Sequence, residues 1–283
     1  MRKFVVLGCS DARYGDFVVN HWLKSLMNNI DLKVVDVVIL NYGLTKEQKE
    51  RILKKGAKIV DCKKDGHIVN LRYRDMLRFL ERNKYKQVLS CDSGDIIFQK
   101  NIMDLFYKNP NKFKGIIENL QPPTLEYALA KKTFSEETKK MIIEILKGKD
   151  MINGGVIAAP NEKFKLLCKT MLKFIERMDT FGPDQIVLNY VFYKEGFIDL
   201  GRDYNYIPVT ANGKLSVKNG VFYDRGRIIS ILHNAGNYSF FRIVKDFGYG
   251  REYNRTFSYF VYYLLRGIYK SISFYRNLKS KTS

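Results

Sequence analysis

The sequence predicts an α/β fold, in which helices flank a mostly parallel central sheet, followed by a C-terminal helical extension. Short apolar runs alternate with amphipathic stretches from residue 4 to residue 61. This spacing of strand and helix is typical of a parallel sheet with crossover helices. With 283 residues, 46% of them hydrophobic, the chain is long enough for one large α/β domain or two small ones.

The first part of the chain has the clearest alternation. Strands are expected at Phe4–Cys9, Val34–Leu40, Ala57–Asp61 and Val88–Cys91. Helices are expected at Asp16–Met27, Thr45–Lys55 and Asn70–Arg82, with residues 10–15 as a loop before the first. Asp16 and Thr45 are the expected N-caps, because their side-chain oxygens can accept hydrogen bonds from unpaired N–H groups of the first turn.

The second part is less regular. The remaining expected helices are Asn101–Tyr107, Ser135–Lys147, Phe164–Met178 and one opened by Gly182-Pro183-Asp184. The remaining expected strands are Lys114–Ile117, Asp150–Ala159 and Ile228–Leu232, with an extended segment at Ile198–Ile207 and a turn at Gln121–Pro123. The insertion at 121–150 is a candidate part of an acceptor site.

Two acids, Asp92 and Asp95, follow the fourth expected strand. Two ionised carboxylates there repel each other and are costly to desolvate. A divalent cation would remove the conflict, because hard cations prefer carboxylate oxygens. The alternative is a solvated turn, since Asp, Ser and Gly are common turn residues. Ligands of parallel sheets bind outside the carboxyl ends of the strands, so the turn at residues 8–11 is expected to face the same crevice.

Charge and cysteine pattern narrow the class of partner. The formal net charge of +20 favours anionic partners. Helix-turn-helix and zinc-knuckle spacings are missing from the sequence, so no nucleic-acid partner is expected. The four cysteines are scattered and mostly lie in apolar runs, which indicates free thiols in a reducing compartment. With no signal-peptide pattern and no apolar run of about 18 residues, we expect a cytoplasmic protein.

Three motifs, in this order, resemble those of GT-A glycosyltransferases. The segment Asp92–Gln99 is similar to the family's metal-binding strand end. Asn153–Ile157 resembles its Asn-Gly/Ser-Gly-Val strand, and Asp184–Asn189 resembles its Asp-Gln-x-x-x-Asn helix. The resemblance covers residues 1–236. The family's usual Arg between the two acids is Gly94 here, so any contact made by that Arg is missing.

The resemblance implies a Rossmann-like GT-A domain over residues 1–239. It implies transfer of a sugar from a nucleotide-diphosphate sugar to a glycan or lipid-linked acceptor, with Mn²⁺ or Mg²⁺ as cofactor. The implied metal ligands are Asp92, Asp95 and His233, although a lone histidine is often structural. The implied catalytic residues are Asp184 and Gln185, in motifs more similar to those of retaining members. The implied donor- or substrate-binding residues are Gly8, Cys9, Ser10, Arg13, Arg72, Asp92, Ser93, Asn153, Gly154, Gly155 and Asn189.

Arg72 is chosen by its place on the helix expected at 70–82. Arg74, Arg78 and Arg82 are spaced by four residues, share one face and read as a solvated face. Arg72 points elsewhere, and in the resembled family a basic residue near this position contacts the donor.

Residues 240–283 lie outside the resemblance and form the basic, aromatic extension. The apolar run Phe257–Leu265 is followed by five cations, Arg266, Lys270, Arg276, Lys279 and Lys281. The run is too short to span a bilayer but suits an interfacial helix on anionic lipid, which would hold the protein on the inner face of the membrane. The alternative is a helix packed on the catalytic domain.

Two other functions remain open at this point. A nucleotidyltransferase would use the same metal and nucleotide chemistry but release a different product. In a non-catalytic protein that binds membrane surfaces or polyanions, Asp92 and Asp95 would only be turn residues.

Overall fold

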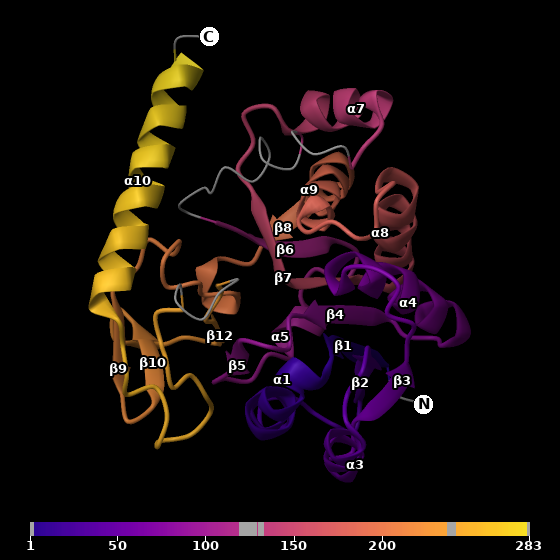
Figure 1. Cartoon of the computed structure of the whole chain (residues 1–283), viewed down its shortest axis with the longest axis vertical. Coiled ribbons are helices and arrows are strands. Elements are labelled where there is room, and N and C mark those ends of the chain that lie inside the picture. Colours follow the sequence, from indigo (N-terminus) through magenta and orange to yellow (C-terminus); the bar gives the residue numbers. More distant parts are fainter. Residues whose placement is uncertain (1–2, 119–128, 130–132, 237–241, 282–283) are drawn as a thin grey trace.

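The computed structural model describes residues 3–118, 129, 133–236 and 242–281 (Figure 1). Its strands are β1 (Phe4–Ser10), β2 (Val35–Asn41), β3 (Lys58–Asp61), β4 (Gln87–Cys91), β5 (Ile96–Phe98), β6 (Phe113–Ile117), β7 (Ile152–Pro160), β8 (Phe197–Asp199), β9 (Leu215–Lys218), β10 (Val221–Asp224), β11 (Arg227–Ile228) and β12 (Ile231–His233). Its helices are α1 (Ala12–Phe17), the π-helical η1 (Val18–Trp22), α2 (Leu23–Met27), α3 (Lys46–Lys54), α4 (Ile68–Arg82), α5 (Asp104–Tyr107), α7 (Glu136–Leu146), α8 (Asn161–Phe174), α9 (Pro183–Glu195), the 3₁₀ turn η2 (Arg202–Tyr204) and α10 (Tyr259–Lys281).

The central sheet has seven strands in the order β3-β2-β1-β4-β7-β6-β8. The first four are parallel, β7 runs antiparallel to both of its neighbours, and β6 and β8 are parallel. The predicted mostly parallel sheet flanked by helices is therefore confirmed. Because β7 lies between β4 and β6, the start of β7 meets the carboxyl ends of both strands at one edge.

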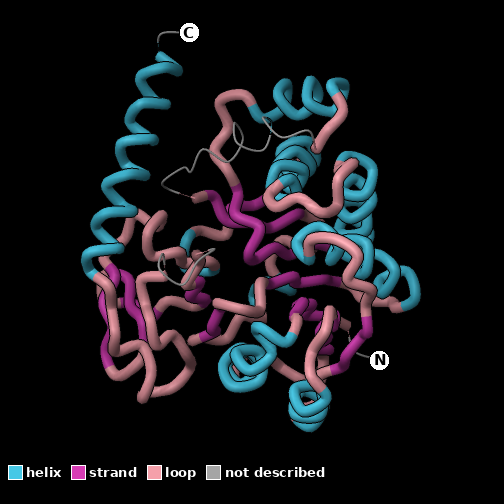
Figure 2. Tube along the Cα trace, in the orientation of Figure 1, coloured by secondary structure: helices cyan, strands magenta, loops and turns pink. Residues whose placement is uncertain are grey.

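The sheet is covered on both faces, and β1 illustrates why. Its alternate residues Val5 and Leu7 pack in the cluster that contains α4, α8 and α9. Phe4 and Val6 pack in the opposite cluster, with η1, α2, α3 and α5. Strands buried on both faces appear in a sequence as continuous apolar runs. These strands could therefore be predicted from the sequence. Figure 2 shows the helices on either side of the strands.

A third cluster joins the last part of the chain to the sheet domain. The short strand β12 pairs antiparallel with β5, and β9, β10 and β11 form a separate small sheet. The C-terminal extension is helical, as predicted: α10 stands along this part of the molecule (Figure 1). Its residue Val261 is buried against the cluster, and Arg266 donates from Nη1 to the carbonyl of Ala211 at 2.8 Å.

The first helix begins earlier than predicted. Asp11, not Asp16, is the N-cap, and its carboxylate accepts a hydrogen bond from the Arg13 N–H at 3.1 Å. The expected loop at residues 10–15 is therefore wrong. Gly15 was the misleading signal, because it serves packing rather than a turn: a Cβ there would lie 2.3 Å from the side chain of Gln48.

Other differences are local. The expected extended segment at 198–207 contains η2, and the expected strand at 228–232 is split between β11 and β12. The helices expected at 101–107 and 164–178 are α5 and α8, with shifted bounds. The turn expected at Gln121–Pro123 and the boundary at residue 239 lie outside the described residues.

Candidate active site

The turn after β4 is anchored through its backbone to three distant parts of the chain. The N–H of Asp92 donates to the carbonyl of Gly155 at 2.9 Å, and Nε1 of Trp22 donates to the carbonyl of Asp92 at 3.0 Å. The N–H of Asn234 donates to the carbonyl of Asp95 at 2.9 Å. The two carboxylates therefore project from a turn that these three hydrogen bonds hold in place.

Asp92, Asp95 and His233 converge at this turn. One ligand atom from each of the three lies within 4.8 Å of the others. His233 Nε2 is 3.4 Å from Asp95 Oδ1 and 3.9 Å from Asp92 Oδ2. The pairing of β12 with β5 places His233 opposite Ile96, next to Asp95. The turn therefore meets a buried histidine and does not face solvent alone.

The environment of His233 is buried and polar. Its side chain is 5% exposed, and its Nδ1 lies 2.9 Å from Asn205 Oδ1. Burial alone would lower the pKa of the imidazole, but the carboxylates of Asp95 and Asp92 outweigh it and the pKa is raised. Glycine at position 155 makes room for the ring, because a Cβ there would lie 2.5 Å from His233 Cε1.

Arg72 lies at the centre of a second group of charges. It is on α4, its side chain is 6% exposed, and it donates from Nη1 to Asp92 Oδ1 at 2.6 Å. Its Nη2 donates to Asp184 Oδ2 at 3.0 Å. Burial raises the pKa of Asp184, and Arg72 opposes that effect. Arg74 was expected on a solvated face, but it is mostly buried and pairs with Asp65 and Asp75.

Several other predicted site residues have structural partners. The side chain of Asn189 donates to the carbonyls of Ile152 and Gln185 and accepts from the Ile152 N–H. These bonds to β7 and α9 use both N–H groups of the Asn189 side chain, which is fully buried. The predicted contact of Asn189 with the nucleotide-sugar is therefore not supported. Gly8 packs tightly against Trp22, and Ser93 Oγ donates to the carbonyl of Cys9.

The remaining predicted residues lie around the same edge of the sheet. Ser10 is buried and donates to the carbonyl of Asp11, while Arg13 is exposed and lies 5.1 Å from the centre of the Tyr14 ring. Burial raises the pKa of the Cys9 thiol to about 11. Gln185 is half-buried at the start of α9, beside Asp184.

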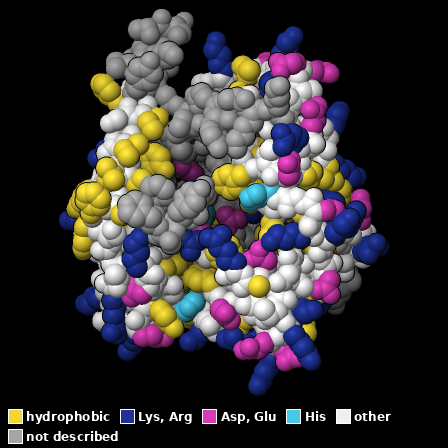
Figure 3. Space-filling model, viewed as in Figure 1, with side chains coloured by type: hydrophobic (Ala, Val, Ile, Leu, Met, Phe, Trp, Pro, Cys, Tyr) yellow, Lys and Arg dark blue, Asp and Glu magenta, His cyan; other side chains and the backbone are white. Residues whose placement is uncertain are grey.

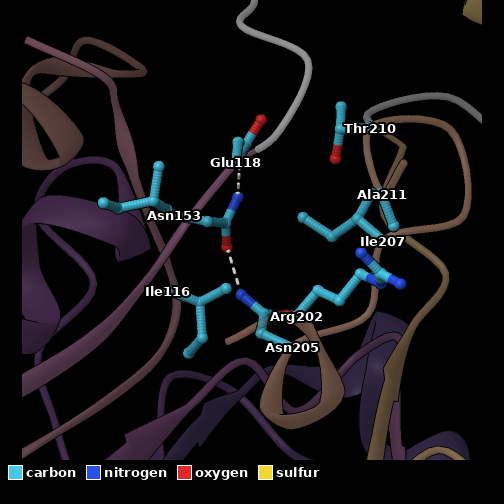
Figure 4. Close-up of a pocket in the computed structure, with 9 residues that line it drawn as sticks. Ile116, Glu118, Asn153, Arg202, Asn205, Ile207, Thr210 and Ala211 are labelled. Carbon is cyan, nitrogen blue, oxygen red and sulfur yellow. Dashed lines mark hydrogen bonds between the residues drawn. The ribbon is translucent and has the colours of Figure 1, made fainter. Parts of the chain in front are cut away.

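Three residues of the site were missed by the sequence reading. Arg242 donates from Nη2 to Asp95 Oδ2 at 3.2 Å. Glu118, directly after β6, accepts a hydrogen bond from Asn153, and Asn205 donates to Asn153 Oδ1 at 2.8 Å (Figure 4). An acid directly after an expected strand was an available signal for Glu118. Asn205 and Arg242 belong to no recognisable motif.

Glu118, Asn153 and Asn205 also line a pocket beside the metal-ligand group. The pocket is partly open to solvent, and Arg202, Ile207 and Thr210 contribute to its wall. Figure 4 shows the three polar side chains in a row along one side of it. Burial raises the pKa of Glu118 to about 7, against the lowering effects of Asn153 and His233.

The residues present fit a divalent metal. Two carboxylates and one imidazole are a donor set suited to Mn²⁺-type ions, and carboxylate oxygens also suit Mg²⁺. Asp92 and Asp95 have side chains that are only partly exposed, and His233 is buried. Within the described residues, this is the group of three ligand-type side chains close enough to hold one ion.

Comparison with known proteins gives matches at the level of structure. No protein-family model matches the sequence, and no characterised protein matches it by sequence. The structure is similar to the apo structure of WbbM, a bifunctional glycosyltransferase, with a TM-score of 0.55 and 14% identity over 83% of this chain. That match spans 46% of WbbM, a little under half of its length.

Two structures of LgtC match over nearly the whole of both chains. The galactosyltransferase LgtC in complex with donor and acceptor sugar analogues has a TM-score of 0.56 and 13% identity, covering 93% of this chain and 95% of LgtC. An active-site mutant of LgtC has the same TM-score and coverage at 14% identity. Together with the seven-stranded sheet, these matches show that the chain has the GT-A glycosyltransferase fold.

Proposed function

We propose that this chain is a metal-dependent glycosyltransferase that moves a sugar from a nucleotide-diphosphate sugar to a glycan or lipid-linked acceptor. The observation that carries the proposal is the convergence of Asp92, Asp95 and His233 within 4.8 Å of one another. This group lies at the carboxyl edge of the sheet, where α/β folds bind their ligands.

The metal would be Mn²⁺ or Mg²⁺, held by these three side chains. When bound, it would supply positive charge to the diphosphate that leaves the sugar. Asp92 pairs with Arg72 and Asp95 with Arg242, but a metal held between the two carboxylates would present its charge directly to the diphosphate, so donor binding should depend on the metal.

Arg72 and Asp184 are the proposed residues on the sugar side of the site. Arg72 ties Asp92, a metal ligand, to Asp184 through one guanidinium. That arrangement holds the two carboxylates at a fixed separation before the donor arrives. Asp184 also stands in the first turn of α9, where the helix dipole favours a carboxylate. We propose that Asp184 acts at the sugar or at the acceptor hydroxyl, with Gln185 beside it.

Arg242 is the proposed second cation for the diphosphate. Its guanidinium carbon lies 5.9 Å from the centre of the Tyr14 ring, and its side chain is 22% exposed. The Tyr14 ring in turn covers Gly94, where a Cβ would lie 2.8 Å from the ring. A guanidinium from residue 242 thus reaches the turn that lacks the family's usual arginine. Arg suits phosphate because its fork of N–H donors matches phosphate oxygens.

The proposed acceptor side includes contact with a membrane surface through α10. The sequence of α10 contains five cations and no acid. Its outward face carries exposed apolar residues, among them Phe260 and Tyr263 at 73% and 66% exposure. In Figure 3, hydrophobic side chains gather along this helix. No helix in the described part of the chain is long and apolar enough to cross a membrane. A basic helix with an aromatic face suits the surface of an anionic bilayer.

The test of the central proposal begins with a thermal-shift screen of nucleotide-sugars with and without Mn²⁺. The donor identified in this way is then titrated by calorimetry into the wild type, Asp92→Ala and Asp95→Ala. Each variant is expected to lose Mn²⁺-dependent donor binding, because each loses a metal ligand. Asp104→Ala removes an exposed acid that pairs with Lys108 on α5, a helix that packs on Phe4 at the start of β1. It is the matched control and should bind normally. Normal Mn²⁺-dependent affinity in either folded site variant would contradict the proposal.

Product analysis separates the remaining possibilities. A glycosyltransferase releases a nucleoside diphosphate, whereas a nucleotidyltransferase would transfer a nucleoside monophosphate group from a nucleoside triphosphate and release pyrophosphate. We propose retention at the anomeric carbon, on the similarity of the Asn153-Gly154-Gly155 and Asp184-Gln185 motifs to those of retaining members. Proton NMR of the fresh product tests this, because the coupling constant of the anomeric proton distinguishes the two anomers.

A further inference from the structure

We propose that Asn205 is a positioning residue that decides which ring nitrogen of His233 is available to a metal. Asn205 lies in η2's C-cap position, 28 residues before the histidine, and is buried. The inference rests on the proposed function only in that a metal is the expected ligand. The assignment of the ring nitrogens follows from the hydrogen bonds alone.

The orientation of the Asn153 amide is fixed by a backbone N–H, which can only donate a hydrogen bond. The N–H of Gly155 donates to the side-chain oxygen of Asn153 at 2.8 Å, so that atom of Asn153 must be the acceptor Oδ1. The side chain of Asn205 approaches the same oxygen at 2.8 Å and must present its N–H donor there. The orientation of both amides is therefore fixed, although amide oxygens and nitrogens look alike by shape.

The orientation of Asn205 fixes the direction of its hydrogen bond with His233. With its nitrogen committed to Asn153, Asn205 turns its oxygen toward His233 Nδ1 at 2.9 Å. An amide oxygen only accepts hydrogen bonds, so Nδ1 must carry the proton. In the neutral imidazole, Nε2 then has a free lone pair. Nε2 is the nitrogen that faces the carboxylates of Asp95 and Asp92.

The opposite tautomer would serve the site badly. If Nε2 carried the only proton, it would donate to Asp95 Oδ1, 3.4 Å away, and occupy a carboxylate that the metal needs. Nδ1 would then place a lone pair against the lone pairs of Asn205 Oδ1. Metal-binding histidines commonly donate their other ring N–H to an oxygen that fixes the tautomer. Here that oxygen belongs to Asn205, and its orientation is set by Asn153.

The first readout is the tautomer itself, measured by ¹⁵N NMR of the imidazole in protein treated with chelator, in the alkaline range where the ring is neutral. The wild type should be protonated at Nδ1. Asn205→Leu, of similar size and without an acceptor, should shift the population toward protonation at Nε2. Asn205→Asp gives up the donor to Asn153 but keeps an acceptor toward Nδ1, and it should therefore keep the wild-type tautomer. An unchanged tautomer in Asn205→Leu would overturn the inference.

The second readout is the affinity for Mn²⁺ alone, from the electron paramagnetic resonance signal of the free ion. Loss of an outer-shell partner typically weakens metal binding by about 10- to 100-fold, and Asn205→Leu should fall in that range. Asn205→Asp should bind at least as tightly as the wild type.

Asn234→Leu is the matched control. Asn234 is the same residue type, is buried, and adjoins His233, but its side chain bonds to the backbone of Val244 instead. It should lose stability without changing the tautomer. If Asn234→Leu and Asn205→Leu weaken Mn²⁺ binding equally, the role of Asn205 is only structural and the inference fails.

The two proposals can fail separately. If the wild type shows no metal-dependent donor binding, with Mn²⁺ or with Mg²⁺, the proposed function fails, while the tautomer of His233 still tests the role of Asn205. If Mn²⁺ binds, but Asn205→Leu changes neither the affinity for Mn²⁺ nor the tautomer of His233, the inference fails and the proposed function stands.

Discussion

Arg72 and Asp184, 112 residues apart in the sequence, meet in a buried ion pair with Nη2 of the arginine 3.0 Å from Oδ2 of the aspartate. The same guanidinium also binds Asp92. A buried charge that loses its partner is costly, because neither water nor an opposite charge then compensates for its desolvation. The stability of the fold and the geometry of the site therefore depend on one side chain.

Arg72→Met is expected to lower the free energy of unfolding by about 3–5 kcal/mol, the usual result of removing one partner from a buried pair. Arg78→Met is the control, since Arg78 lies on the same helix but has a side chain that is 62% exposed. Its loss should cost less than about 1 kcal/mol. Urea denaturation of both variants measures the difference, and equal losses would show that the Arg72 pair adds no stability.

Asp184→Asn is expected to lower kcat while leaving donor affinity nearly unchanged. The reason is that a group acting mainly in the transition state affects turnover more than ground-state binding. The amide can still accept a hydrogen bond from Arg72, so the fold should persist. Steady-state kinetics and donor titration by calorimetry measure the two effects. Normal turnover would limit the role of Asp184 to its pairing with Arg72 and its place in the first turn of α9.

Gly155→Ala is expected to displace the His233 ring, because the added methyl group would lie 2.5 Å from Cε1. Overpacking of this kind typically costs about 1–3 kcal/mol, and Mn²⁺ binding should weaken as well. The neighbouring Gly154→Ala is the control: a Cβ there would meet Leu188 and Arg72 only at 3.8 and 4.0 Å. Thermal unfolding and Mn²⁺ titration measure the stability and the metal affinity of both variants. If the two variants behave alike, the role of Gly155 is contradicted.

Glu118 should make stability depend on pH. Burial raises its pKa from 4.5 to about 7, so between these values the folded protein holds a proton that the unfolded chain releases. The contribution of this carboxyl to stability is thus complete below about pH 4.5 and is lost as pH rises to about 7. The loss is at most about 3.5 kcal/mol, because each unit of the rise from 4.5 to about 7 corresponds to about 1.4 kcal/mol.

Glu118→Gln, which cannot ionise, is expected to lack this decline when unfolding is followed in urea from pH 4.5 to 8 with a chelator present. The exposed Glu144 supplies the control, and Glu144→Gln should follow the wild-type curve. If the free energy of unfolding varies with pH in the same way in the wild type and in Glu118→Gln, the carboxyl is not buried as a neutral acid.

Flotation with liposomes tests the outward face of α10. Binding to vesicles that contain anionic lipid should fall when Phe260→Ser and Tyr263→Ser are combined, because the aromatic face is lost while the inner face with Val261 stays packed. Leu53→Ser combined with Tyr107→Ser removes comparable exposed side chains elsewhere and should bind normally. Equal flotation of all three proteins, or of none, would contradict membrane contact.

The sequence predicted well those features that depend on local pattern. Val88–Cys91 reads as a strand because both of its faces are buried, and the acids after it fall at the edge where parallel strands end. Asp11 was missed as a cap because Gly15 was interpreted as a loop residue, whereas its bare Cα lets α1 pack on Gln48. A contact with a residue 33 positions away leaves no mark on the local pattern.

The contacts around Asn153 could not be predicted for a different reason. They depend on the strand order, in which β7 enters between β4 and β6 and brings Glu118 and Asn205 to the same side chain. Hydrophobic periodicity identifies strands but does not order them. Asn189 illustrates the same limit, because its motif suggested a ligand contact and its partner is the backbone of β7.

The pairing of β5 with β12 has a consequence for how the molecule matures. His233 reaches Asp95 only when Ile231, Leu232 and His233 stand opposite Phe98, Ile97 and Ile96. A slip of one position would turn the imidazole to the opposite side of the ribbon and bring Leu232 to the acids. A newly made chain therefore cannot assemble all three ligands until its late segment has returned and aligned correctly.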